Sequence, residues 1–400
     1  MKILIVTPRV PYPPYRGDKI HMFNVLKRLA AKHEIHLVCF AQTPADEENL
    51  KHLQPYCRSV EGVKLPLWRS LLRCLAGLFS REPLQVHYFK SGRMRALIEQ
   101  KCREHRFDVI HTHIIRAAQY TAHLPHAFRA IDVTDAVSLY LRRFLSQEKN
   151  WFKRAVLKVE AGRIKKYQSI LEDFDACFVC SEVDAEELRK SAPAARIEVL
   201  PNGVDVDCFY PQNQVAYDPS RIIFTGNLSY YPNADAVLYF VQEIFPFIKA
   251  EVPQAQLYLV GQSPPRKIQK LAREDVVVTG FVEDIREYYL RSAVMVSPIR
   301  FGAGTLNKVL ESLAMGVPVV ATPVGIEGLG LTNGKEILIA HHPRTFADHV
   351  IRVLKNPELR KQLGQAGMAL VRERYNWDSI VASLESFYRE ACERMTLVQQ

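Results

Sequence analysis

Short apolar runs alternate along the chain with segments of helical periodicity. The runs are rich in valine, isoleucine and leucine, which is typical of strands buried on both faces of a parallel sheet. This alternation predicts an α/β fold in which crossover helices join parallel strands. The strands predicted in the first half are 3–7, 35–40, 109–112, 130–133, 176–180 and 197–200. Those predicted in the second half are 222–225, 257–260, 276–279, 294–297, 317–321 and 337–339.

The two sets of strands are separated by a turn-rich segment. Residues 201–205 read Pro-Asn-Gly-Val-Asp, a composition that is common at domain boundaries. A chain of 400 residues is long enough for two hydrophobic cores. We therefore expect two doubly wound domains, each with its own sheet. Ligands of such sheets bind at the carboxyl ends of the strands.

Residues 293–321 predict a strand, a glycine turn, a helix and a second strand. Gly302 and Gly304 open the turn, and the helix is expected to run from about Thr305 until Gly316 ends it. A glycine turn that leads into a helix N-terminus is a natural anion site, because free backbone N–H groups and the positive end of the helix dipole coincide there. Arg300 and Lys308 bracket this turn.

One face of that helix carries a hydroxyl, an ammonium and a carboxylate at intervals of three residues, from Thr305, Lys308 and Glu311. A cation for phosphate and a carboxylate for sugar hydroxyls would suit a nucleotide-diphosphate sugar. The alternative is a solvated helix face with an exposed Lys308–Glu311 pair. The sequence of this stretch leaves both interpretations open.

The net charge of +10 is unevenly distributed. Residues 1–198 hold 33 Lys and Arg against 22 Asp and Glu, and the second half is nearly balanced. A basic first half indicates an acidic partner such as phospholipid, lipid-linked pyrophosphate or nucleic acid. Residues 67–79 and 142–166 combine basic, aromatic and aliphatic side chains, and 142–166 is expected to form one interfacial helix. They predict contact with an anionic membrane, with a core-facing helix as the alternative. Nucleic acid is disfavoured because no recognisable binding module accompanies the charge.

No segment of the sequence predicts a membrane span or a signal peptide. We therefore expect a cytoplasmic protein, with peripheral attachment to the inner membrane as a further hypothesis. The eight cysteines are scattered and do not predict a disulfide framework in that compartment. Cys177 and Cys180 form a CxxC pair, but an odd separation on a strand places the two thiols on opposite faces.

Candidate chemistry in the first half follows the predicted strands. The loop 8–18 contains four prolines and ends at Arg16 and Gly17, and it is expected to carry an acceptor site. It lacks the GxGxxG pattern of dinucleotide dehydrogenases. His111 and His113 share one face of a strand. Two histidines without a third recognisable ligand are weak evidence for a metal, so we expect His111 to be packed and His113 to contact substrate. Paired carboxylates at Asp132 and Asp135 also invite a glycosidase hypothesis, which we do not favour.

Taken together, these motifs resemble the retaining glycosyltransferases of family 4, which have the GT-B fold. The last block, 308–320, is the most specific part of the resemblance. The matching segments are the loop around Gly17, 108–113, 201–205 with Phe209 and Pro211, 224–226, 260–261, 279–281, 308–311 and 316–320. Residues 224–228 and 231–233 are most similar to sugar transferases of exopolysaccharide clusters associated with the PEP-CTERM sorting system.

The resemblance implies two Rossmann-like domains facing each other across a cleft. Residues 1–200 would bind the acceptor, residues 201–375 would bind the nucleotide sugar, and residues 376–400 would form a helix that returns to the first domain. It implies a hexosyltransferase that needs no metal and no cofactor. The donor would be of the UDP or GDP type, and the acceptor would be a lipid-linked or other glycan in exopolysaccharide or cell-surface synthesis. No nucleic-acid partner is expected.

The resemblance also implies site residues. Glu311 corresponds to the second glutamate of the family's E-x7-E motif, which holds the donor ribose, whereas Ala303 stands where the first glutamate should be. Asn227 replaces a common arginine of the family, so we expect Arg300 and Lys308 to supply cations for the pyrophosphate. His113 is expected near the donor sugar, and Asp135 is expected to orient the acceptor. The donor-binding residues expected in all are Gly226, Asn227, Phe281, Arg300, Gly302, Ala303, Gly304, Thr305, Lys308 and Glu311.

The sequence leaves two other functional classes open. One is a sugar-nucleotide epimerase or a phosphorylase with the same fold. The other is a protein that binds nucleotide sugar without catalysis.

Overall fold

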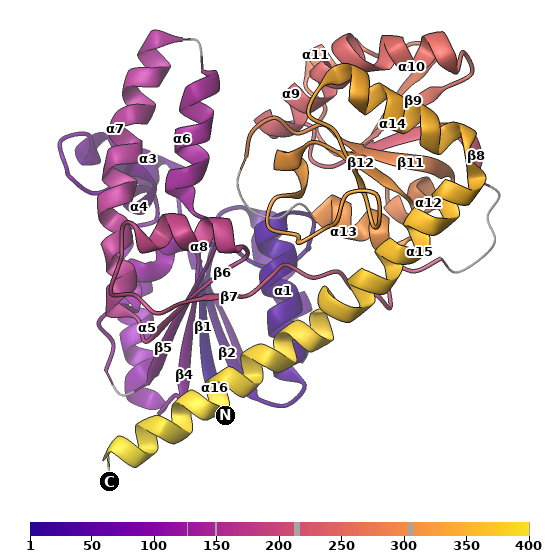
Figure 1. The fold of residues 1–400 in the computed structure, drawn as a ribbon. Helices are drawn as coiled ribbons and strands as arrows, with labels where there is room; N and C mark the ends of the chain where they lie inside the picture. The colour runs from indigo at the N-terminus through magenta and orange to yellow at the C-terminus, as the bar shows by residue number, and fades with distance from the viewer. Residues whose placement is uncertain (126, 149, 212–216, 303–306, 400) are drawn as a thin grey trace. The chain divides into compact units, whose positions relative to one another are not determined.

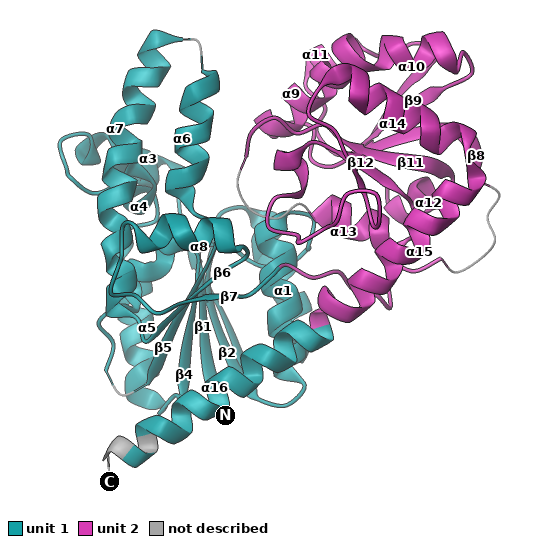
Figure 2. Ribbon diagram, viewed as in Figure 1, with its two compact units in different colours: residues 1–201, 378–400 teal, residues 202–377 magenta. Residues whose placement is uncertain are grey.

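The computed structural model describes residues 1–125, 127–148, 150–211, 217–302 and 307–399. The chain divides into two compact units, which have different colours in Figure 2. Unit 1 comprises residues 1–201 and 378–400, and unit 2 comprises residues 202–377. Each unit has its own sheet and its own core.

Seven parallel strands form the sheet of unit 1, in the order β3-β2-β1-β4-β5-β6-β7 (Figure 1). Their bounds are Lys2–Thr7 (β1), Glu34–Ala41 (β2), Ser59–Lys64 (β3), Val109–His113 (β4), Phe128–Thr134 (β5), Ala176–Val179 (β6) and Ile197–Val199 (β7). Six of these strands match the apolar runs of the sequence, which confirms those predictions. The sequence analysis missed β3 because this edge strand is polar and mostly unburied, with only Val63 in the core.

Helices cover both faces of this sheet (Figure 1). Their bounds are Gly17–Ala30 (α1), Pro44–Asn49 (α2), Leu67–Gly77 (α3), Leu84–Tyr88 (α4), Gly92–Glu104 (α5), Val137–Gln147 (α6), Trp151–Tyr167 (α7), Glu182–Arg189 (α8) and Trp377–Gln399 (α16). The last helix, α16, is joined to α1 by the ion pair Arg28–Asp378 and to the turn after α1 by the ion pair Lys32–Glu385. It thereby brings the end of the chain back to unit 1.

The expectation of one basic helix over residues 142–166 is wrong. Two helices, α6 and α7, cover this segment. The Asn150 side chain accepts a hydrogen bond from the backbone N–H of Lys153. This N-cap begins α7 as a separate helix.

Six parallel strands form the sheet of unit 2, in the order β10-β9-β8-β11-β12-β13. Their bounds are Asp218–Thr225 (β8), Gln256–Val260 (β9), Val276–Gly280 (β10), Ser292–Ser297 (β11), Val319–Ala321 (β12) and Leu338–Ile339 (β13). The helices are Tyr231–Tyr239 (α9), Phe245–Glu251 (α10), Arg266–Gln269 (α11), Ile285–Leu290 (α12), Asn307–Ala314 (α13), Pro343–Lys355 (α14) and Pro357–Arg374 (α15). All six predicted strands are present.

Alternate residues of the central strand β8 enter two different cores of unit 2. Ile222 and Phe224 pack with α9, α10 and α14, whereas Ile223 packs with α13 and α15 on the other face. Burial on both faces explains why the strands read as unbroken apolar runs. Gly316, with φ of 70°, follows the end of α13 as predicted, because the left-handed region is accessible to glycine at little cost.

These two α/β units with parallel sheets confirm the predicted fold class. Within the residues that the structure describes, no helix has both the length and the apolar character needed to cross a bilayer.

Candidate active site

Several candidate residues lie where the strand order of each sheet reverses. Successive crossovers leave a parallel sheet in opposite directions at such a point, and the loops there open a crevice that binds ligands. In unit 1 the reversal lies between β1 and β4, and in unit 2 it lies between β8 and β11. Gly226 follows β8, Arg300 and Gly302 follow β11, and His113 ends β4.

In unit 2, Lys308 lies on α13 and is only 8% exposed. Its ammonium donates a hydrogen bond to Asn233 Oδ1 at 2.7 Å and lies 4.1 Å from the centre of the Phe224 ring. Burial lowers the pKa of Lys308 to about 7. The alternative of a solvated Lys308–Glu311 surface pair is therefore wrong. A buried lysine that titrates near neutrality is typical of a functional site.

The turn after β8 lies directly beside this ammonium. A Cβ placed on Gly226 would come 3.5 Å from Lys308 Nζ and 3.1 Å from Asn233 Nδ2. Asn233 Nδ2 in turn donates to the carbonyl of Asn227 at 2.8 Å. The predicted donor residues Gly226, Asn227 and Lys308 thus form one connected group, which Asn233 holds together.

The loop after β9 packs directly against this turn. A Cβ on Gly261 would fall only 1.7 Å from the carbonyl oxygen of Gly226. The Gly261 N–H donates to the carbonyl of Gly280, and the Gly226 N–H donates to that of Val260. Because only glycine fits this approach, the position of Gly226 depends directly on Gly261.

Glu311 lies one turn along α13 from Lys308. The Tyr289 hydroxyl donates to Glu311 Oε2 at 3.1 Å and lies 2.7 Å from Thr225 Oγ1. Burial raises the pKa of Glu311 to about 7, and the hydrogen bond from Tyr289 and the charge of Lys308 oppose this shift only in part. Lys308 and Glu311 therefore both exchange protons near neutral pH. A bound anion would favour the charged lysine.

Arg300, in contrast, already has an acidic partner. Its guanidinium donates to both carboxylate oxygens of Asp235, at 2.9 and 2.6 Å, and lies 4.7 Å from the centre of the Tyr239 ring. The hydrogen bonds to Asp235 raise the pKa of Arg300. Within unit 2, Lys308 is thus the better placed cation of the two predicted for pyrophosphate, and Arg300 acts there together with Asp235.

The other predicted donor residues differ in exposure, and three of them lie outside the described residues. Phe281 follows β10 with its side chain 55% exposed, and Gly302 follows β11 and is half-buried. The side chain of Asn227 accepts hydrogen bonds from the N–H and the hydroxyl of Ser229. Ala303, Gly304 and Thr305 lie outside the described residues, as does the predicted start of the helix.

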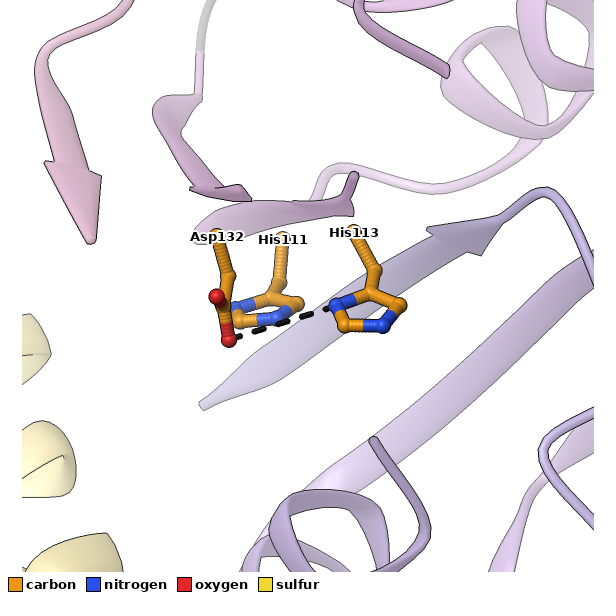
Figure 3. Close-up of side chains that lie close together, drawn as sticks. All are labelled: His111, His113 and Asp132. Atoms are coloured by element: carbon orange, nitrogen blue, oxygen red, sulfur yellow. Dashed lines mark ion pairs between the residues drawn. The ribbon is translucent and has the colours of Figure 1, made fainter. Parts of the chain in front are cut away.

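In unit 1, His113 ends β4 and belongs to a buried polar group with Asp132 (Figure 3). His113 Nε2 donates to the carbonyl of Asp18 at 3.2 Å, and Nδ1 lies 4.0 Å from Asp132 Oδ2. His21 Nε2, from α1, hydrogen-bonds to the same Oδ2 at 2.5 Å. Burial lowers the pKa of His113 to about 4, so this imidazole is neutral near pH 7. A neutral imidazole can accept a proton or hydrogen-bond to a sugar without adding charge.

His111 has the packed role that its strand position predicts. It is fully buried, and its Nδ1 hydrogen-bonds to the hydroxyl of Tyr388 on α16 at 2.6 Å. Burial also lowers the pKa of His111 to about 4. In this part of the chain, His111, His113 and Asp132 could hold a metal ion, because one ligand atom from each lies within 4.8 Å of the others. The effect of EDTA on turnover therefore tests the prediction of a metal-free site.

Asp135 follows β5, and its side chain is half-buried. Burial raises its pKa to about 7, and the nearby charge of Asp184 adds to this effect. Asp184 itself accepts a hydrogen bond from the backbone N–H of Ala136. A carboxyl group with a pKa near 7 is suited to accept a proton from an incoming hydroxyl group.

The two predicted acceptor residues lie at the start of α1. Arg16 precedes the helix with its side chain 51% exposed, and a Cβ on Gly17 would meet open space. A small pocket lies beside them and reaches the edge of His113. It is lined by Thr7, Pro8, Arg9, Pro11, Asp18, Lys19, Met22, His113 and Ile114.

Sequence reasoning missed the residues that position the predicted ones. Asn233, Tyr289, Asp235 and His21 each hydrogen-bond to a candidate residue from a different element. Asn233 lies in a segment that carried the family resemblance, so its position offered a signal. For Tyr289 and His21 there was none, since ordinary core packing explains both equally well.

Two family models match the chain. The model "Glycosyltransferase Family 4" matches residues 15–208, and the model "Glycosyl transferases group 1" matches residues 219–356. The chain belongs to the family 4 glycosyltransferases. This glycosyltransferase therefore acts on a nucleotide sugar, as the sequence predicted.

The glycosyltransferase is similar over most of its length to several known proteins. It is 21% identical to an uncharacterised 44.6 kDa protein in the cps region of Klebsiella pneumoniae, over 96% of this chain and 98% of that one. Its fold matches sucrose-phosphate synthase from Thermosynechococcus elongatus with a TM-score of 0.74 and 19% identity, over 98% and 99% of the two chains. It also matches Anabaena HepE in complex with UDP-glucose, with a TM-score of 0.66 and 12% identity, over 98% and 100%.

Acidification is expected to destabilise the polar group around His113. The pKa of His111 and of His113 is about 4 in the folded protein, below the ordinary value of 6.5. Stability is therefore complete above pH 6.5 and is lost as the pH falls toward 4, because only the unfolded chain binds these protons. At pH 5 the loss should be about 2 kcal/mol per histidine.

Thermal unfolding between pH 7 and pH 5 measures this effect. The His111→Asn variant keeps an oxygen that can bond Tyr388 but loses one titrating group, so its Tm should fall less steeply with pH than that of the wild type. Equal falls of Tm with pH in the two proteins would contradict the lowered pKa of His111.

Proposed function

We propose that this glycosyltransferase moves a sugar from a nucleotide-diphosphate sugar of the UDP or GDP type to a lipid-linked acceptor during synthesis of a bacterial surface polysaccharide. Unit 2 would bind the donor and unit 1 the acceptor. The relative from a cps region supports the polysaccharide role. The link to the PEP-CTERM system stays a hypothesis that rests on the sequence resemblance.

One observation carries the proposal for the donor site. Lys308 is buried beside the Gly226 turn at the β8–β11 reversal, with a pKa of about 7 in the absence of ligand. A diphosphate placed there would hold this lysine in its charged form. As the glycosidic bond breaks, negative charge grows on the departing diphosphate, and a fixed ammonium stabilises that charge. Glu311, held by Tyr289, is the proposed partner of the ribose hydroxyls.

We assign retention of configuration to the reaction on the basis of the family resemblance. The acceptor hydroxyl would attack the face from which the diphosphate departs, and the diphosphate oxygen can take its proton. No protein nucleophile is needed for such a step. His113 would hydrogen-bond to the donor sugar, and Asp135 would orient the acceptor hydroxyl. The backbone N–H of Gly302, with those of Ala303 and Gly304, would orient the sugar or the pyrophosphate.

Titration with UDP, GDP, ADP and CMP, followed by intrinsic fluorescence, tests the donor site. We expect one of the diphosphates to bind and the corresponding nucleotide sugar to be turned over at the same rate with and without EDTA. Failure of all four nucleotides to bind would contradict the proposal. Loss of activity in EDTA with recovery in Zn²⁺ would instead assign a metal to His111, His113 and Asp132.

A further inference from the structure

The amphipathic helix α3 turns its apolar face toward solvent and its small residues toward the core. Its buried positions are Ser70 and Gly77, whereas its large apolar side chains face solvent. Phe79, just beyond the helix, is 97% exposed. The exposed apolar side chains here are Leu67, Trp68, Leu71, Leu72, Leu75, Leu78 and Phe79. The core-facing alternative is therefore wrong for this stripe. A contiguous apolar surface of this kind marks an interaction site.

A second exposed apolar stripe lies on α7. Trp151 is 79% exposed and Phe152 is 63% exposed, and Val156 and Val159 continue the stripe toward the middle of the helix. Only Ile164 of this helix is buried. The helix therefore contributes little to the core of unit 1 beyond its last turns.

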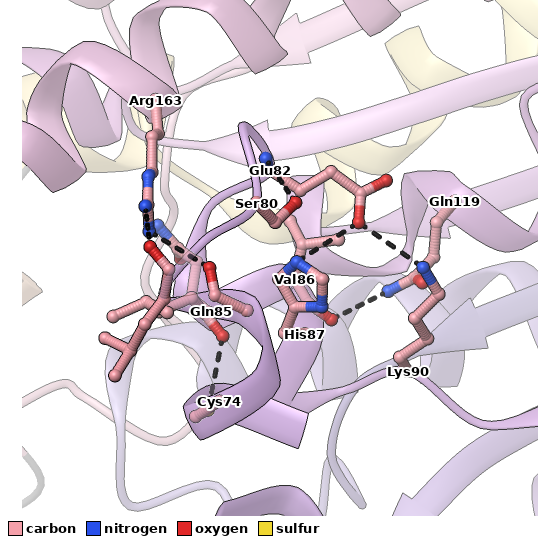
Figure 4. A network of polar contacts seen from close by, with 12 residues as sticks. Cys74, Ser80, Glu82, Gln85, Val86, His87, Lys90, Gln119 and Arg163 are labelled. Atoms are coloured by element: carbon pink, nitrogen blue, oxygen red, sulfur yellow. Dashed lines mark hydrogen bonds and ion pairs between the residues drawn. The ribbon is translucent and has the colours of Figure 1, made fainter. Parts of the chain in front are cut away.

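Polar contacts fasten the two helices to each other (Figure 4). Arg163 of α7 donates to the carbonyls of Gly77 and Leu78 at the end of α3, at 3.3 and 2.6 Å. The Glu160 carboxylate accepts from the backbone N–H groups of Leu84 and Gln85 at the start of α4, at 3.1 and 3.4 Å, and the Leu84 carbonyl in turn accepts from Cys74 Sγ of α3 at 3.5 Å. The two stripes, far apart in the sequence, thus belong to one supported surface.

Both helices also carry basic side chains. Arg69 lies 5.0 Å from the centre of the exposed Trp68 ring, and residues 67–79 contain no acidic residue. The exposed cations of α7 are Lys153, Arg154, Lys158, Lys165 and Lys166. A protein interface is usually poor in lysine at its centre. Apolar and aromatic side chains with flanking lysine and arginine are instead typical of helices that lie in the headgroup region of an anionic bilayer.

We propose that α3 and α7 form a docking surface for a bilayer that contains anionic phospholipid. Leucine, tryptophan and phenylalanine side chains of α3 and α7 enter the headgroup region, and the arginine and lysine side chains contact lipid phosphates. The inference rests on the proposed function in one respect, since a lipid-linked acceptor resides in such a bilayer. Docking would present unit 1 to that acceptor.

Co-sedimentation with vesicles tests the surface. The full chain should bind phosphatidylcholine vesicles that contain phosphatidylglycerol, and binding should weaken in high salt and with phosphatidylcholine alone. Leu72→Glu/Leu75→Glu should abolish binding, and Arg69→Gln/Arg73→Gln should weaken it about tenfold or more. Arg352→Gln/Lys361→Gln, which removes two exposed charges from unit 2, is the matched control and should bind as the wild type does.

Two further measurements separate the outcomes. All variants should keep the wild-type Tm and the wild-type affinity for the nucleotide, because none of the substituted side chains is buried. The four substitutions on α3 also lie in another unit than the donor site. Equal binding by the Leu72→Glu/Leu75→Glu variant, or no vesicle binding by the wild type, would overturn the proposal. A dimer in light scattering that Leu72→Glu/Leu75→Glu dissociates would show that a second copy covers the surface. Loss of nucleotide binding alone would count against the donor site and not against docking.

Discussion

Lys308→Met should lower kcat/KM for the nucleotide sugar by about 10²–10³, the usual effect of removing one group that stabilises developing negative charge. Methionine keeps the length and packing of the buried side chain but removes the ammonium beside the Gly226 turn. Part of the loss should appear in kcat, because the charge on the departing diphosphate is largest in the transition state. Steady-state kinetics with saturating acceptor measures both constants.

Lys270→Met is the matched control, since this exposed lysine follows α11 in the same unit. It should leave kcat and KM unchanged. Wild-type turnover and donor affinity in Lys308→Met would remove Lys308 from the donor site. Arg300, with Asp235, would then be the remaining described candidate of the two predicted cations.

Gly261→Ala should disrupt unit 2 more severely than any other single methyl group added at the described donor loops. The new Cβ would lie 1.7 Å from the Gly226 carbonyl oxygen, which is backbone and cannot rotate away. Relief requires the turn after β8 to move, and Lys308 and Asn233 are bonded to or packed against that turn. We expect a loss of roughly 3 kcal/mol or more in stability. Any folded protein should lack measurable nucleotide binding.

Chemical denaturation and nucleotide titration measure the two parts of this effect. Gly162→Ala makes the same chemical change on α7 at a position where a Cβ meets no atom within 4 Å. It should be neutral or slightly stabilising, because alanine favours the helix. An unchanged denaturation midpoint in Gly261→Ala would contradict this prediction. It would show that the loop after β9 can move away from the turn after β8 at little cost in stability.

The predictable part of this fold is the part set by burial. Twelve strands followed from apolar runs, because a strand covered on both faces has little freedom to be polar. The edge strand β3 did not, since Val63 alone of its residues enters the core. The break between α6 and α7 was also missed, because it depends on the Asn150 cap within a stretch of continuous helical periodicity.

Partners within the candidate site were less predictable than its principal residues. Lys308 and Glu311 could be proposed from their spacing on one helix. Tyr289 lies 22 residues before Glu311, and His21 lies 111 residues before Asp132. Only the packing of separate elements brings such pairs together. The apolar stripe of α3 shows the same limit, because periodicity defines a helix face and does not say whether that face turns inward.

Unit 1 is built from two separate segments of the chain, and this affects the order of folding during synthesis. Its core contains His111 from β4, which is bonded to Tyr388 from α16. The ribosome synthesises α16 only after the whole of unit 2. Unit 2 is continuous in sequence and has all its strands before residue 340. The second unit can therefore reach its final structure while the first still lacks its closing helix, although domains usually fold in the order of their synthesis.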